Sequence, residues 1–278
     1  MSGPIERLVV TLDAASESRT AIDTAVRLAA RTGAALHALF VEDEDLLSLA
    51  GLPFARQVTI GGGAERLTSE TVALQLRAAA ERTRRELIGA ARHHQVAWTF
   101  EIVRGADERR VAGASERDLM IAGGLDRPIA GPFRVAHRRW RRLETSAGPF
   151  LLARGRCMAA ATAPGSVVTL LRGHDAGAAR VFDMAAQIAS ATDSVLAVLC
   201  APALANETGV EHWIAHRAAA HRVPVRVEAA PAEPATLHER LLQLDCRVVA
   251  LDAGVLENNT SALAELVERF ACDMLIVP

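Results

Sequence analysis

The sequence predicts an α/β protein made of two tandem three-layer α/β/α sandwiches, each with a five-stranded parallel sheet. Short runs rich in Val, Ile and Leu alternate with longer segments of helical periodicity along the 278 residues. This alternation occurs twice in the same order. The Ala- and Gly-rich stretch 155–165 separates the two repeats and is typical of a linker. We therefore expect one domain at 1–154 and a second at 166–278.

Each element of the first half has a local justification. The run 7–13 is continuously apolar, as in a strand buried on both faces. In 18–33 apolar residues recur at helical spacing, with Ser16 or Ser18 as the N-cap and Gly33 as the stop. Residues 44–65 are expected to be irregular. Strands are expected at 7–13, 35–43, 96–105, 118–124 and 149–154, and helices at 18–33, 69–94, 107–116 and 134–147.

The second half repeats this order with the same kinds of segment. Strands are expected at 166–173, 194–201, 223–230, 246–254 and 273–278, and helices at 176–192, 209–222, 236–244 and 260–271. Strands that alternate with helices pair in parallel through right-handed crossovers, so both halves are expected to share one topology.

Composition excludes several classes of protein. The net charge is −2, with 31 basic and 33 acidic residues, which does not favour a nucleic-acid binder. No apolar run is long enough for a membrane helix, and the first residues do not resemble a signal peptide. Cys157, Cys200, Cys246 and Cys272 are far apart without a CxxC pair, so we expect reduced, small apolar residues rather than zinc ligands or disulfides. These observations predict a soluble, cytoplasmic protein.

The stretch "VVTLDAASESRTAIDTAVRLAARTGAALHALFVEDEDLL", followed by "LPFARQV", resembles the opening of universal stress protein (UspA-like) domains. "DLMIAGG" followed by "GPFLLA", and the final "FACDMLIVP", resemble the end of such domains. The resemblance implies an adenine nucleotide alpha hydrolase-like fold and a stress-associated role. Single-domain members often dimerise through their last strands. In this chain it therefore implies an intramolecular pseudo-dimer, in which "PFLLA" meets "MLIVP"; a further homodimer stays open.

The nucleotide loop of the family is degenerate in this sequence. ATP-binding members carry G-x-x-G, nine residues and then G-[S/T], which brings backbone amides and a helix N-terminus to the phosphates. Here Gly123 is followed three residues later by Asp126, and Gly124 by Arg127. The helix that should open with Gly-Ser instead contains "RVAHRRWRR". We therefore expect no cofactor, with ATP or AMP as the alternative.

Part of a cleft remains in the first half. The resemblance places Asp13 near the ribose and base of a nucleotide and Val41 beside the adenine, although Asp13 also suits a turn after a strand. In the second half Gly173 is aligned with Asp13, and Gly254 is the single glycine left in the loop, so no ATP is expected there. The candidate nucleotide-contacting residues are Asp13, Val41, Gly123, Gly124, Arg127 and Arg138.

Other residues suggest weaker possibilities. The arginine-rich segment 134–142 is interpreted as a solvated helix face, or else as a surface for anions, RNA, DNA or a protein partner. His212 and His216 have the i, i+4 spacing of a metal pair but no evident third ligand. No nucleophile or phosphate-loop motif occurs, so no catalytic residue is assigned and no enzyme is predicted.

Two hypotheses follow. In the first, the chain is a non-catalytic, stress-associated regulator or scaffold that binds protein partners or an unidentified small ligand. In the second, it is an adenine-nucleotide-binding switch, with slow hydrolysis as an option, that uses the remaining cleft of the first half.

Overall fold

The computed structural model describes residues 4–14, 18–42, 44–58, 64–104, 115, 117–123, 148–155, 165–205, 207–231, 234–255 and 272–278. The predicted helices 134–147 and 260–271, all of the predicted helix 107–116 except Ser115, and most of the predicted linker lie outside these residues. Within the described part of the chain, no helix combines the length and the apolarity needed to span a membrane.

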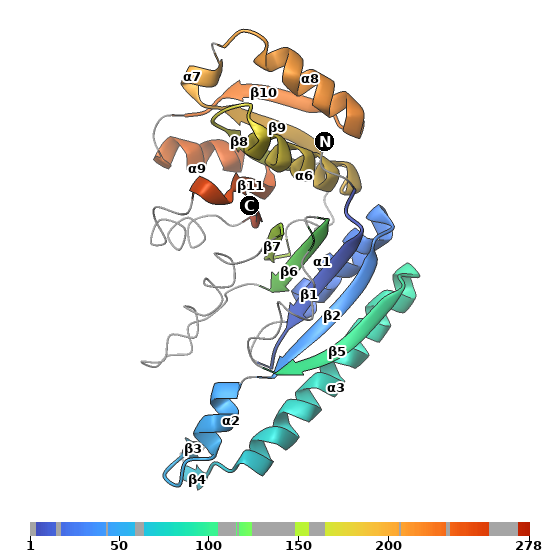
Figure 1. The fold of residues 1–278 in the computed structure, drawn as a ribbon, viewed down its shortest axis with the longest axis vertical. Helices are drawn as coiled ribbons and strands as arrows, with labels where there is room; N and C mark the ends of the chain where they lie inside the picture. Colours follow the sequence, from blue (N-terminus) through green and yellow to red (C-terminus); the bar gives the residue numbers. More distant parts are fainter. Residues whose placement is uncertain are drawn as a thin grey trace.

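Ten strands form one continuous sheet in the order β10-β9-β8-β11-β12-β7-β6-β1-β2-β5. Figure 1 shows the second-half strands at one end of this sheet and the first-half strands at the other. The first-half strands are β1 (Arg7–Leu12), β2 (Ala35–Glu42), β5 (Trp98–Arg104), β6 (Asp118–Gly123) and β7 (Phe150–Ala153). The second-half strands are β8 (Ser166–Leu171), β9 (Val195–Cys200), β10 (Val225–Ala229), β11 (Cys246–Asp252) and β12 (Asp273–Val277).

Both halves have the same strand order. Numbered within its own half, each is a parallel 3-2-1-4-5 arrangement, so the predicted alternation of strands and helices gives the predicted parallel pairing. The halves meet where β12 pairs with β7 in antiparallel fashion, with Leu275 opposite Leu151. This is the contact between last strands that the family resemblance implied. It also removes two sheet edges that would otherwise be free to pair with other chains.

Helices pack on the sheet because their apolar faces match its buried side chains. α1 (Ser18–Thr32) ends just before Gly33, whose φ is 71°. α3 (Ser69–His94) begins after Thr68, whose hydroxyl accepts from the Thr71 N–H at 3.2 Å. The other described helices are α2 (Glu44–Ala50), α6 (Ala176–Ala191), α7 (Pro202–Ala205), α8 (Val210–His221) and α9 (Pro234–Gln243), with a 3-10 turn at Ala253–Val255.

The largest core cluster lies under α1, α3, α6 and α8 and includes Leu8, Phe40 and Phe182. A second cluster fills the opposite face of the sheet and includes Val9, Met274 and Leu241 of α9. The inner strands therefore bury side chains on both faces, as their continuous apolar runs indicated, whereas the edge strands β5 and β10 are largely half-buried or exposed.

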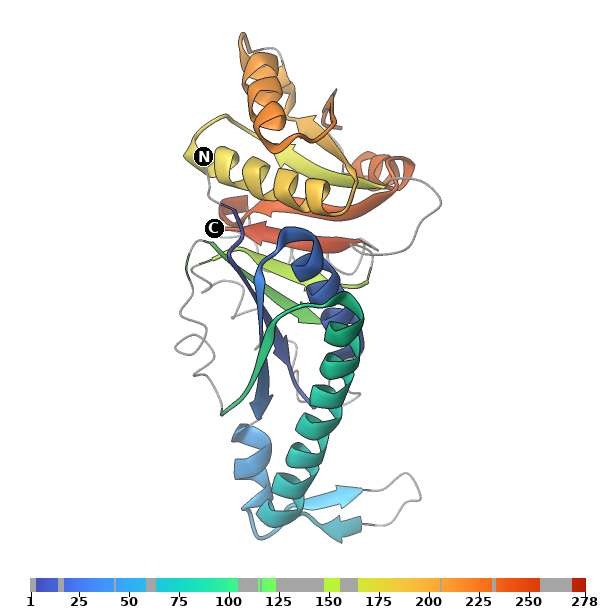
Figure 2. The same cartoon turned by 90° about the vertical axis from the view of Figure 1, so that its right-hand side faces the viewer.

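The region predicted to be irregular has secondary structure of its own. Residues 44–50 form α2, and β3 (Arg56–Val58) pairs in antiparallel fashion with β4 (Ala64–Arg66). Figure 2 shows that α2, this hairpin and the start of α3 project beyond the sheet. They pack around a small apolar cluster of their own, which includes Leu67, Val72 and Leu76.

Candidate functional site

The strand order places a topological switch point in each half. In open α/β sheets, ligands bind at the carboxyl ends of the strands where neighbouring strands send their connections to opposite sides. In this fold those points lie between β1 and β6 and between β8 and β11.

Three of the predicted site residues lie at the first-half switch point. Asp13 directly follows β1 and is half-buried, Val41 lies near the end of β2 with 5 % exposed, and Gly123 ends β6. The register, with Leu12 opposite Phe40, brings these residues to the ends of three neighbouring strands. The other three predicted residues, Gly124, Arg127 and Arg138, lie outside the described residues.

A buried acid follows Val41 at the end of β2. Glu42, which ends β2, is 8 % exposed and its carboxylate is 3.0 Å from the Nε atom of Arg104 on β5. This ion pair joins the ends of two strands. The sequence-based list of site residues did not include it.

The second-half crevice holds a cavity of about 220 Å³ between the ends of β8 and β11 and the N-terminus of α6. Its volume is below the roughly 300–1,000 Å³ typical of pockets for nucleotide-sized ligands. The lining residues are Leu170, Arg172, Gly173, Asp175, Ala178, Val181, Asp252 and Gly254.

Asp175 caps α6 at this cavity. Its carboxylate accepts a hydrogen bond from the Ala178 N–H at 2.8 Å, and its backbone carbonyl accepts from the Ala179 N–H at 3.0 Å. A helix N-terminus carries partial positive charge and donor groups that would suit a phosphate. In this chain an internal carboxylate already occupies part of that position.

Asp252 supplies a second carboxylate at the same place. One of its oxygens accepts from the Gly254 N–H at 2.7 Å. The other would lie 2.9 Å from a Cβ atom on Gly177, and an Asp175 oxygen would lie 3.4 Å from the same point. The missing side chain of Gly177 therefore lets Asp252 approach the first turn of α6, and two negative charges flank that turn.

The two halves differ at the position after the first strand. β1 and β8 have the same length and the same order of buried and half-buried residues, so Asp13 corresponds to Arg172. The sequence comparison had aligned Gly173 with Asp13, which the strand ends show to be wrong by one residue. Among the described residues that line the second-half cavity, Arg172 is the one with a cationic side chain.

Comparisons with known proteins find the likeness in structure rather than in sequence. No family model matches the sequence, and no curated protein matches it. A universal stress protein from Archaeoglobus fulgidus DSM 4304 superposes with a TM-score of 0.65 at 12 % identity, covering 97 % of both chains.

Two proteins from Pseudomonas aeruginosa superpose over 98 % of this chain at 16 % identity. A candidate universal stress protein of strain UCBPP-PA14 has a TM-score of 0.58 with 93 % of its chain covered, and a functionally unknown protein of strain PAO1 has 0.60 with 92 % covered. This chain has the universal stress protein fold.

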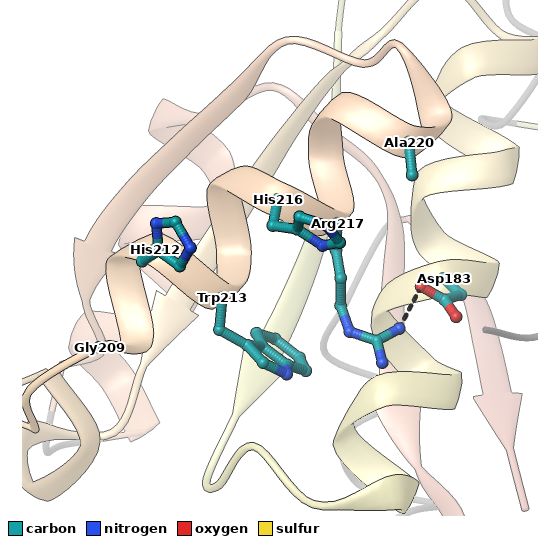
Figure 3. Close-up of a pocket in the computed structure, with 7 residues that line it drawn as sticks. All are labelled: Asp183, Gly209, His212, Trp213, His216, Arg217 and Ala220. Carbon is teal, nitrogen blue, oxygen red and sulfur yellow. Dashed lines mark hydrogen bonds and ion pairs between the residues drawn. The ribbon is translucent and has the colours of Figure 1, made fainter.

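The universal stress protein fold of this chain also carries a cavity of about 390 Å³ on the outer surface, between α6 and α8. Figure 3 shows Arg217 between Asp183 and Trp213. The Arg217 Nη1 atom lies 2.7 Å from a carboxylate oxygen of Asp183, and its guanidinium carbon is 4.8 Å from the Trp213 ring centre. His221 lies 3.3 Å from the same oxygen. The charged groups at this cavity are therefore engaged with one another, which indicates a structural cluster.

The predicted histidine pair belongs to the same surface. His212 and His216 lie on exposed turns of α8 and line this cavity. Among the described residues, no three His, Cys, Asp or Glu side chains are grouped so that they could hold a metal ion.

Proposed function

We propose that this chain is a non-catalytic protein of the universal stress type, a stress-associated regulator or scaffold that acts through protein contacts or a small ligand. We further propose that its second-half crevice does not accept ATP. The observation that carries the proposal is the pair of carboxylates, Asp175 and Asp252, at the N-terminus of α6.

Electrostatics supports this proposal. A triphosphate at this crevice would bring several negative charges next to two carboxylates that already use the local N–H donors. Like charges at about 4 Å repel by about 1 kcal/mol in bulk water and by about 4 kcal/mol near a protein surface. Arg172, the one cation among the described lining residues, does not offset two carboxylates, and the cavity that these residues line is small for a nucleotide. A small ligand that carries a cationic or hydroxyl group fits this lining better than a phosphate ester does.

A second candidate function rests on the first half. Asp13, Val41 and Gly123 lie together at the ends of neighbouring strands, where this fold can hold a ligand. In this alternative the first half binds ATP or AMP as a switch, and the second half does not take part.

Calorimetric titration of the full chain with ATP and AMP, with and without magnesium, tests both candidates. We expect no binding tighter than about 1 mM, which corresponds to roughly 4 kcal/mol of binding free energy. Micromolar binding that disappears in Asp13→Ala would establish the alternative. Micromolar binding that survives Asp13→Ala and is lost on Arg172→Ala would overturn the proposal for the second half.

A matched variant sharpens the experiment. The double variant Asp175→Ser, Asp252→Gly removes both carboxylates. Serine at 175 keeps a residue that can cap α6, and glycine at 252 places a small residue at the loop. If repulsion excludes phosphates, this double variant should bind ATP or inorganic phosphate at least tenfold more tightly than the natural chain does. The stress-associated part is tested by the abundance of the protein in its host during growth, starvation and oxidative stress.

A further inference from the structure

Two cysteines meet at the other end of the second-half sheet. Cys246 is the first residue of β11, and Cys272 directly precedes β12. These strands are parallel neighbours, with Val248 opposite Asp273, so Cys272 lies within one residue of the level of Cys246.

A bulge turns both side chains to the same face of the sheet. The pairing of β11 with β8 shifts between Cys246 and Val248, which inserts one extra residue and reverses the alternation at Cys246. As a result Cys246 and Cys272 belong to the same apolar cluster, together with Val249 and Met274.

The two thiols are hydrogen-bonded to each other. This bond lowers the pKa of Cys272, which accepts it, and together with burial it raises the pKa of Cys246. Cys246 and Cys272 are both buried, with 8 % and 5 % of their surface exposed, so the oxidant that suits them is a small one. A thiolate is the reactive form of cysteine, and a neighbouring thiol that donates to it is the arrangement found in dithiol redox pairs.

We propose that Cys246 and Cys272 are a redox pair that a hydroperoxide converts reversibly into a disulfide. The Cys272 thiolate attacks the peroxide, so that an S–O bond forms, the O–O bond breaks and an alkoxide or hydroxide leaves. Cys246 then attacks the sulfenic sulfur. The S–S bond forms, the S–O bond breaks, and the departing hydroxide takes the Cys246 proton to become water. The two thiols together lose two electrons, which reduce the peroxide.

The bond would close a loop that contains two of the residues that line the second-half cavity. Residues 247–271 run from Cys246 through Asp252 and Gly254 and back to Cys272. β12, at the far side of this bond, is also the strand that pairs with β7 of the first half. Oxidation would therefore tie together the crevice strand and the strand that joins the halves.

Peptide mapping of the full chain decides the proposal. The folded protein is treated with hydrogen peroxide, its remaining thiols are alkylated, and it is digested without reduction. We expect a cross-linked Cys246–Cys272 peptide pair that dithiothreitol releases. Closing a loop of this length should also raise the midpoint of thermal unfolding by roughly 5 °C or more.

Variants test the order of steps. In the Cys246→Ser variant, Cys272 should remain a sulfenic acid that dimedone traps. In the Cys272→Ser variant, dimedone should trap Cys246 at least tenfold less than it traps Cys272 in the first variant. Cys200→Ser, at a buried cysteine of β9, should leave the cross-link unchanged. The proposal is overturned if both thiols stay alkylatable in the folded natural chain at a peroxide dose that oxidises them in the urea-unfolded chain. That comparison needs no variant to fold.

Discussion

The carboxylate of Asp273 accepts a hydrogen bond from the backbone N–H of Arg154 at 2.6 Å, across 119 residues of sequence. Asp273 opens β12 and is fully buried, and Arg154 directly follows β7. The bond therefore lies at the end of the antiparallel pair that joins the two halves of the sheet. It satisfies a backbone donor just beyond the last strand residue, where the regular ladder ends.

We expect Asp273→Ala to lower the free energy of unfolding by about 2 kcal/mol or more, because it removes a charge-assisted bond and leaves a donor without this acceptor. Urea denaturation followed by circular dichroism measures the change. Arg31→Ala is the matched control, since its ion pair with Asp193 also joins the halves but is exposed on both sides. That variant should change stability by less than about 0.5 kcal/mol; equal losses in the two variants would contradict this explanation.

The buried pair of Asp183 and Arg217 gives a second prediction. Asp183 is 1 % exposed, so truncating Arg217 to Ala takes one ion-pair partner from a buried carboxylate, which keeps His221 at 3.3 Å. We expect a loss of about 3 kcal/mol for each of Arg217→Ala and Asp183→Ala. The double variant should lose at least about 1 kcal/mol less than the sum, as measured by a urea double-mutant cycle. His216→Ala, on the exposed side of the same helix, should be close to neutral.

Much of the fold could be predicted because it depends on periodicity. The buried strands β1 and β8 are continuous apolar runs, and α3 has strong helix formers along its length. The segment 44–65 was predicted incorrectly, since its described apolar residues form a small cluster with Leu67 and α3, and its strands are three residues long. Such elements are stabilised by tertiary contacts that leave little periodic signal.

The site was harder to predict because it depends on exact strand ends and on approach between distant residues. In the sequence, Asp13 was aligned with Gly173, one residue too far along the chain, and its correspondence with Arg172 was therefore missed. The proximity of Asp252 to Gly177 depends on how β11 ends beside α6, and that of Cys246 to Cys272 depends on a bulge. The acidic cap "HDAG" after a strand was the one signal in the sequence that could have indicated Asp175.

His37 predicts how stability depends on pH. Burial lowers the pKa of His37 below its ordinary 6.5; Glu101, 3.6 Å away, opposes this shift and Arg7 adds to it. Because the unfolded chain binds the proton more tightly, the stabilisation is present above pH 6.5 and is lost as the pH falls through the lower, folded-state pKa. His37→Asn should therefore reduce the decline of the urea midpoint between pH 7.5 and 5. Glu101→Gln should make the decline steeper, and unchanged slopes in both variants would rule out this assignment.

The close approach of Gly177 and Asp252 gives a prediction that separates the effect of helix propensity on stability from the effect of the contact with the Asp252 carboxylate. Replacing glycine with alanine inside a helix normally stabilises it by about 0.5–1 kcal/mol. At Gly177 the new Cβ would meet an Asp252 oxygen at 2.9 Å, so that the carboxylate must move and its bond to the Gly254 N–H must weaken. We expect Gly177→Ala to give no gain in the natural chain but a gain of about 0.5–1 kcal/mol in an Asp252→Gly background.

The control for this cycle is Gly89→Ala in α3, where nothing lies within 4 Å of the added Cβ. That substitution should stabilise the protein by about the same amount in both backgrounds, because it touches only helix propensity. Urea denaturation of the six chains gives the comparison. If Gly177→Ala behaves like Gly89→Ala in the natural chain, then Asp252 does not hold its position against the first turn of α6, and the electrostatic argument against phosphate binding fails with it.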